Sequence, residues 1–102
     1  MRRKNRQSDE ELLDAVRRGD TSAYGMLYQR HVLPARALAR RLVRGDEEVE
    51  DVLVETFAGV LEIIRRGGGP GSAFRPFLLA SLRRYAAAGE VGNGRDVTGS
   101  PG

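Results

Sequence analysis

The 102-residue chain has room for one domain, and its 17 Lys and Arg residues outnumber its 14 Asp and Glu residues, giving a formal net charge of +3. No Cys and only one His are present, which excludes disulfide scaffolds, thiol nucleophiles, thiolate zinc sites and histidine clusters, so we expect no metal and no other cofactor. No apolar stretch has the length of a membrane span and the polar start does not resemble a secretory signal, so we expect a soluble cytoplasmic protein without membrane contact.

The charges are distributed unevenly along the chain. Arginine supplies 16 of the 17 basic residues, and guanidinium groups suit planar contacts with phosphates, carboxylates and bases. The stretch between Gly45 and Ile64, in contrast, carries only acidic charges, namely Asp46, Glu47, Glu48, Glu50, Asp51, Glu55 and Glu62. An acidic segment within a basic chain indicates two partners of opposite charge.

We expect residues 1–7 to form a basic arm. After it, capping residues and the spacing of apolar residues predict two helices. Ser8 and Glu11 form a capping box that begins the first helix. Asp20 is the expected N-cap of the second helix, whose apolar residues follow at helical spacing. Pro34 lies inside this second segment and removes one backbone donor, so we expect a kink or a break near residues 30–34.

The third helix is the clearest amphipathic segment of the chain. Asp46 is its expected N-cap, and its apolar residues continue at helical spacing to Ile64. A glycine-rich loop at residues 67–71 interrupts regular structure. Ser72 can then cap a fourth helix, which we expect to end at Gly89.

These segments define the expected organisation of the chain. Residues 8–89 form one domain, an all-α compact bundle of three to four helices, because no segment alternates as a strand does. Residues 90–102 lack the apolar residues to fold, so we expect a flexible tail or the start of a linker.

Candidate catalytic residues lack the partners that catalysis requires, so we expect no enzyme. Asp51 and Glu55 lie at i, i+4 on a solvated helix face, the serines have no His and Asp context, and the glycine run lacks the Lys and Ser/Thr ending of a phosphate loop. His31 is expected to be a partly buried or surface helix residue rather than a titrating functional group. Core packing is expected for the aromatic residues Tyr24, Tyr28, Phe57, Phe77 and Tyr85. Phe74, beside the loop, is a candidate for contact with a ligand.

The third helix carries an acidic stripe formed by Glu48, Asp51, Glu55 and Glu62. These residues lack a basic partner at i, i+4, and Val54 lies on the same outward side. An acidic stripe of this kind is either a solvated face or one half of a contact surface, and the sequence leaves both interpretations open.

Several short motifs stand in a fixed order along the chain. The first are DEELL at residues 9–13, RGD at 18–20, AY at 23–24, LYQRH at 27–31 and ARRLV at 39–43. The next are VEDVLVETF at 49–57, then FRPFLL at 74–79, followed by RR at 83–84. Together they resemble region 2 of the extracytoplasmic-function sigma factors of bacterial RNA polymerase, in which the third-helix segment is AEDLVQEVF. The resemblance spans residues 8–88.

The resemblance implies two partners and no catalysis. One partner is core RNA polymerase, whose beta-prime coiled coil would contact the third helix at Glu48, Asp51, Val54 and Glu55. The other is the non-template strand of the promoter minus-10 element, which would contact Gly67, Gly68, Gly69, Ser72, Phe74, Arg75, Arg83 and Arg84. A glycine loop lets backbone groups approach a base, while guanidinium groups neutralise phosphate or stack on bases.

The chain departs from the family pattern in three positions and in extent. Val54 stands where the family has Gln, Phe77 where it has Trp, and Arg84 where it has Asn, so no base preference is carried over. Region 4, the helix-turn-helix domain that binds the minus-35 element, is not present, so we expect either an excised domain or a single-domain relative. The rival hypothesis is a sigma-like interaction module that binds a protein such as an anti-sigma factor and does not read DNA.

Overall fold

Four helices make up the regular structure in the computed structural model, which describes residues 7–98, with side chains up to residue 89. They are α1 (Asp9–Arg17), α2 (Ser22–Leu42), α3 (Asp46–Arg65) and α4 (Phe74–Thr98). No strand occurs within residues 7–98, which confirms the all-α prediction. Residues 1–6 of the expected basic arm and residues 99–102 of the expected tail lie outside the described residues.

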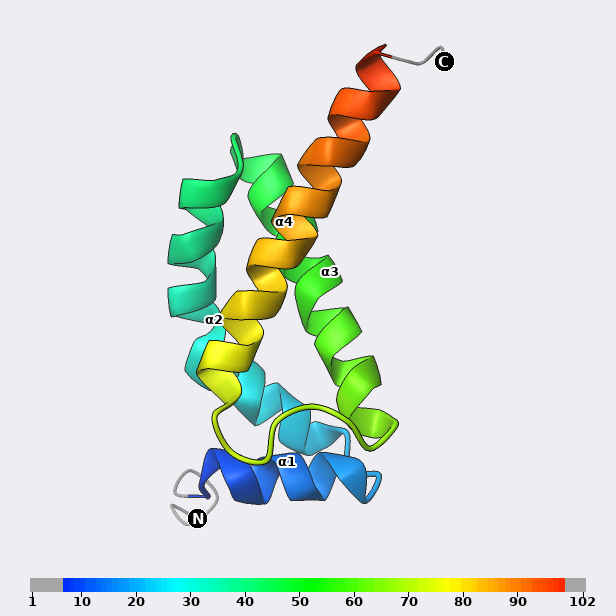
Figure 1. Ribbon diagram of the computed structural model, residues 1–102. Helices are drawn as coiled ribbons and strands as arrows, with labels where there is room; N and C mark the ends of the chain where they lie inside the picture. Colours follow the sequence, from blue (N-terminus) through cyan, green and yellow to red (C-terminus); the bar gives the residue numbers. More distant parts are fainter. Residues whose placement is uncertain (1–6, 99–102) are drawn as a thin grey trace.

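α1 lies across one end of the bundle that the other three helices form (Figure 1). It packs against α2 and α3, and α4 also packs against α2 and α3. The loop that joins α3 to α4 returns to this end of the molecule and runs alongside α1 (Figure 1). The glycine-rich loop and α1 are therefore neighbours in space, although they are far apart in the sequence.

Local side-chain hydrogen bonds form at the start of α1 and just before α2. The predicted capping box of α1 is present, with Ser8 Oγ accepting from the Glu11 amide at 3.0 Å and Glu11 Oε1 accepting from the Ser8 amide at 2.9 Å. Before α2, the Asp20 carboxylate accepts from the amide of Ser22 at 3.1 Å and from its hydroxyl at 2.5 Å. The hydroxyl contact holds the pKa of Asp20 below its usual range.

The helix boundaries differ from the expected ones at three places. α3 begins at Asp46 itself, and its N-cap is Gly45, whose φ of 80° lies in the left-handed region that favours glycine. The N-cap of α2 is Thr21 and not Asp20, and the Thr21 side chain makes no cap hydrogen bond. Pro34 lies inside α2, whose axis bends without breaking (Figure 1), so the expected interruption is a kink. α4 continues past Gly89 to Thr98 and includes Gly92 and Gly94, so the glycines do not end the helix where the sequence indicated. The division of the chain into arm, domain and tail stays a prediction.

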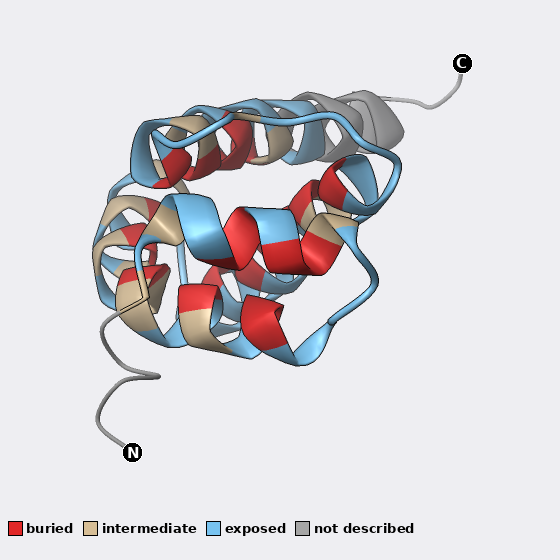
Figure 2. Cartoon of the chain, turned by 90° about the horizontal axis from the view of Figure 1, so that it is seen from below, coloured by how far each residue is buried: buried red, intermediate tan, exposed pale blue. Residues whose placement is uncertain are grey.

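The apolar stripes of the four helices meet in one core, and Figure 2 shows their buried segments facing the interior. Side chains from every helix are fully buried there, among them Leu12, Leu13, Val16, Leu27, Val60, Ile64, Phe74, Leu78 and Leu82. The Tyr24 hydroxyl donates to the Phe57 carbonyl at 2.6 Å, and the Tyr24 ring stands edge-on to the rings of Phe57 and Phe74. The predicted apolar faces therefore form the core.

The five aromatic residues expected in the core differ in burial. Tyr24 and Phe57 are buried, which confirms the prediction for these two. Phe77 and Tyr85 are partly buried against the core, and Tyr28 is 41% exposed, although its ring packs against Phe57 with centroids 4.8 Å apart. Burial raises the pKa of the Tyr24 hydroxyl well above its ordinary value, because the phenolate would lose its hydration.

Candidate functional site

Four exposed residues in the first half of α3 form a surface that we name the acidic face: Glu48, Asp51, Val54 and Glu55. Val54 is 66% exposed, although α3 packs against all three other helices. Within the described residues, none of the three carboxylates forms a salt bridge or a side-chain hydrogen bond. The acidic face therefore presents uncompensated negative charge beside an apolar side chain.

Other acidic residues of α3 do have partners. Glu50 pairs with Arg36 of α2. Glu62 pairs with Arg66, the C-cap residue of α3, with 3.2 Å between Oε2 and Nε. The second pair corrects the expectation that the whole stripe lacks a basic partner at i, i+4. Glu62 belongs to a local ion pair, so the unpaired part of the stripe is shorter than the sequence indicated.

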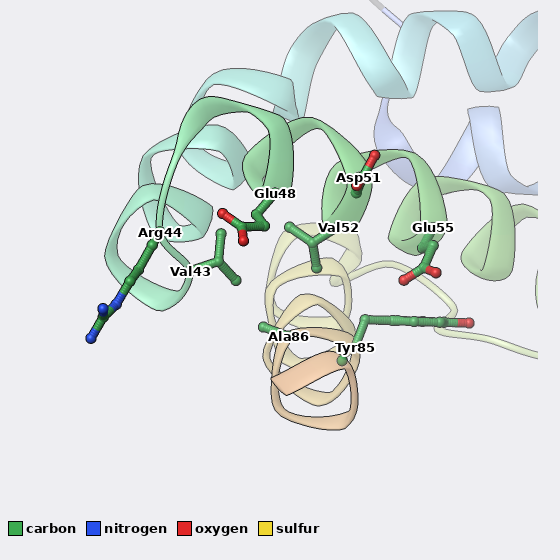
Figure 3. Close-up of a pocket in the computed structure, with 9 residues that line it drawn as sticks. Val43, Arg44, Glu48, Asp51, Val52, Glu55, Tyr85 and Ala86 are labelled. Carbon is green, nitrogen blue, oxygen red and sulfur yellow. The ribbon is translucent and has the colours of Figure 1, made fainter. Parts of the chain in front are cut away.

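The acidic face borders a groove of about 400 Å³ (Figure 3). Residues from α3, α4 and the end of α2 line this groove: Val43, Arg44, Glu48, Asp51, Val52, Glu55, Tyr85, Ala86 and Gly89. The guanidinium group of Arg44 points away from the carboxylates in Figure 3. A groove with apolar walls and three free carboxylates fits a partner surface that combines apolar and cationic side chains.

Gly59 allows α3 and α4 to pack closely beside this groove. A Cβ atom on Gly59 would lie 2.0 Å from Tyr85 Oη and 2.9 Å from Tyr85 Cζ, so the tyrosine ring occupies the space that any other residue would need. The sequence prediction did not single out Gly59. A signal was nevertheless present in the sequence, because Gly59 lies inside a strongly helical segment. Glycine lowers helix propensity there, so its presence indicates that the position must be small for close packing.

We name residues 67–73 the glycine loop. Gly67 and Gly69 have φ values of 92° and 87°, which residues with a side chain rarely adopt. The loop glycines and Ser72 are exposed, as a contact surface requires. α4 begins only at Phe74, so Ser72 lies two residues before the helix. The prediction that Ser72 is the N-cap is therefore wrong.

Arg17 of α1 holds this loop, and sequence reasoning missed it. Its Nη2 donates to the carbonyl oxygens of Gly68 at 2.9 Å and Pro70 at 2.7 Å. Its Nε is buried without a hydrogen-bond partner in the described part of the chain. No periodicity or spacing points to this contact, because 51 residues separate Arg17 from Gly68.

The candidate DNA-binding side chains of α4 fall into two groups. Arg83 and Arg84 are exposed and form no ion pair within the described residues, and Arg75 is exposed while its Nε donates to His31 Nδ1 at 3.1 Å. Phe74 is the exception, because it is 1% exposed and its ring packs against Tyr24 and His31. The Phe74 side chain fills the core and is not available to a base, which corrects its assignment as a contact residue.

The described residues offer neither a metal site nor a membrane-spanning helix. No group of three or more His, Cys, Asp or Glu side chains there is arranged to hold a metal ion. No helix among them is long and apolar enough to cross a membrane.

The fold and its surfaces define a helical binding domain, and a comparison with protein families identifies its class. The sigma-70 region 2 family matches residues 27–87, more than half of the chain, and the chain belongs to this family. Region 2 has a sigma-factor role in RNA polymerase binding and promoter recognition, and the family is not a class of enzymes. Searches of curated proteins and of solved structures found no significant match. The family match begins at Leu27, so α1 lies outside it.

Proposed function

We propose that the chain is region 2 of an extracytoplasmic-function sigma factor that binds both core RNA polymerase and the promoter minus-10 element. The observation that carries this proposal is the separation of charge in a chain of the sigma-70 region 2 family. Free carboxylates gather on the first half of α3, whereas free arginines lie on α4, which follows the glycine loop.

The acidic face is the proposed contact for the beta-prime coiled coil of the polymerase. Asp51 and Glu55, with Glu48 at the margin, would pair with basic side chains, and Val54 would lie within the same contact. Burying a carboxylate that already has an ion pair would first break that pair, but these three carboxylates have none to lose. The groove beside them can accept apolar side chains of the same partner.

The glycine loop and α4 are the proposed contact for the non-template strand of the minus-10 element. The exposed backbone of the loop can approach a base that has left the stack, because its glycines have no side chains to obstruct it. Arg83 and Arg84 can neutralise phosphates, since neither forms an ion pair within the described residues. We therefore expect the domain to prefer single-stranded over duplex DNA, and to bind it weakly.

Charge reversal tests the polymerase contact. Asp51→Lys or Glu55→Lys should weaken capture of core RNA polymerase by at least about tenfold, because each attractive contact becomes repulsive. The control is Glu10→Lys on α1, which makes the same change of charge at an exposed site away from the acidic face. Equal capture of all variants would remove Asp51 and Glu55 from the interface.

Salt dependence tests the DNA contact and separates it from the rival interaction module. Arg83→Ala should weaken binding to a single-stranded minus-10 oligonucleotide and make the log-log salt slope shallower by about 0.7. Arg40→Ala on α2 is the control, because it removes the same charge from an exposed site on another helix. If neither Arg83→Ala nor deletion of two loop glycines alters strand binding or promoter-dependent initiation, the interaction module, with an anti-sigma factor or another protein as partner, replaces this proposal.

A further inference from the structure

The glycine loop is tied to α1 directly through Arg17, and the start of α4 that follows the loop is linked to α1 through His31 of α2. A loop with glycine at four of seven positions has unusually many backbone conformations in isolation, and restricting them opposes binding. In the structure the loop has a defined path alongside α1 (Figure 1). Two sets of hydrogen bonds explain why.

The first tie is Arg17, in the last turn of α1. One guanidinium nitrogen, Nη2, carries two hydrogens and donates to two carbonyl oxygens, those of Gly68 and Pro70. These carbonyls flank Gly69, so the bridge fixes the turn at the residue whose φ is 87°. The Arg17 side chain is itself 24% exposed and also lies 3.6 Å from Asp14, which restricts its movement.

The second tie runs through His31 to the start of α4, which follows the loop. His31 is 5% exposed, and its Nε2 lies 2.8 Å from Asp9 Oδ2 at the start of α1. Arg75, in the first turn of α4, donates from Nε to His31 Nδ1. That nitrogen therefore carries no proton, and a neutral ring donates from Nε2 to Asp9. Arg30 pairs with the second oxygen of the same carboxylate at 3.0 Å.

We propose that α1 holds the glycine loop in one shape, with Arg17 and His31 as the positioning residues for single-stranded DNA bound there. This inference rests on the proposed function of the loop, and it adds a role for a helix that lies outside the family match. Arg17 sets the turn of the loop, while His31 orients the guanidinium group of Arg75 at the entrance to α4. Neither residue has to contact the strand.

The test compares Arg17→Ala with Arg18→Ala, the neighbouring exposed arginine, which forms no hydrogen bond to the loop. In the full chain, backbone ¹⁵N order parameters of the loop glycines should fall below about 0.6 in Arg17→Ala and stay near about 0.85 in Arg18→Ala. Affinity for a random 12-nucleotide single strand should fall about five- to tenfold in Arg17→Ala only, because the loop must then be ordered on binding. Thermal unfolding of both variants shows that the fold is retained.

The salt slope distinguishes positioning from direct contact. If Arg17 only positions the loop, the slope of strand binding stays unchanged, whereas a slope shallower by about 0.7 would show that Arg17 neutralises a phosphate and would overturn the proposal. Unchanged order parameters would also overturn it, as would a loosened loop with unaltered strand affinity. The original protein could fail to bind single-stranded DNA while the order parameters of the loop still fall in Arg17→Ala. In that case the proposed function of the loop fails, but the conclusion that α1 orders the loop stands.

The ring of His31 provides an independent measurement at the second tie. Its ¹⁵N chemical shifts should show an unprotonated Nδ1 and a protonated Nε2 near neutral pH, and Arg75→Ala should alter the Nδ1 shift. A protonated Nδ1 in the original protein would refute the link to Arg75.

Discussion

Substitution of Gly59 tests the closest approach of α3 to α4. A methyl group there would lie 2.0 Å from Tyr85 Oη, so the tyrosine ring would have to move. Overpacking of this kind costs about 1–3 kcal/mol, whereas replacing a helix glycine by alanine gains about 1 kcal/mol. We therefore expect Gly59→Ala to lower the free energy of unfolding by about 0–2 kcal/mol.

The sign should reverse when the ring is removed. In a Tyr85→Ala background, Gly59→Ala should raise the free energy of unfolding by about 1 kcal/mol, because only the gain in helix propensity remains. Urea unfolding of the four proteins, followed by far-ultraviolet circular dichroism, gives the coupling energy, which we expect to be about 1–3 kcal/mol.

The control for this cycle is Gly25→Ala in α2. No atom lies within 4 Å of a Cβ placed on Gly25, so this substitution should stabilise the protein by about 0.5–1 kcal/mol in both backgrounds. A coupling energy between Gly59 and Tyr85 below about 0.5 kcal/mol would refute the close contact.

Three further predictions concern the core and the acidic face. Phe57→Ala should lower the free energy of unfolding by about 3–5 kcal/mol in urea, because Phe57 is buried; a loss below about 1 kcal/mol would contradict its place in the core. Tyr24→Phe should cost about 0.5–1.5 kcal/mol at neutral pH. Above about pH 10, Tyr24 releases a proton in the unfolded state but keeps it in the native state, because burial raises its pKa. The free energy of unfolding of the original protein should therefore fall with pH by up to about 1.4 kcal/mol per pH unit more than that of Tyr24→Phe. Equal pH dependence of the two free energies would contradict this. Val54→Gln should change stability by less than about 0.5 kcal/mol and leave polymerase capture equal or tighter, and weaker capture would show that the apolar side chain is used.

The sequence predicted the helices and their buried faces because both depend on local chemistry and periodicity. The capping box at Ser8 and Glu11 involves residues three positions apart, and the apolar stripe of α3 repeats with the helical period. The ion pair between Glu62 and Arg66 has an equally local signal, which the prediction overlooked.

Features that depend on contact between distant segments could not be predicted in the same way. Phe74 stands at the edge of a loop in the sequence, but its burial depends on where α2 places Tyr24 and His31. Arg17 binds two loop carbonyls because the loop runs alongside α1. No pattern within either segment predicts that the two lie side by side. The cap of α3 was misassigned because Asp46 is a common N-cap type, whereas the backbone at Gly45 requires a positive φ.

The charge that a partner meets at the surface of this chain depends on where the charged residues lie and not on the net charge alone. The chain carries a net charge of +3, so its average field would repel a basic partner. Charges more than about 8 Å apart are largely screened at physiological ionic strength, so a partner that touches α3 experiences mainly the charges beside it. Those are three free carboxylates, because Arg44 points away from them and no salt bridge joins Arg83 or Arg84 to α3 within the described residues. The fold thereby lets one small basic domain present unpaired carboxylates on α3 and exposed arginines on α4.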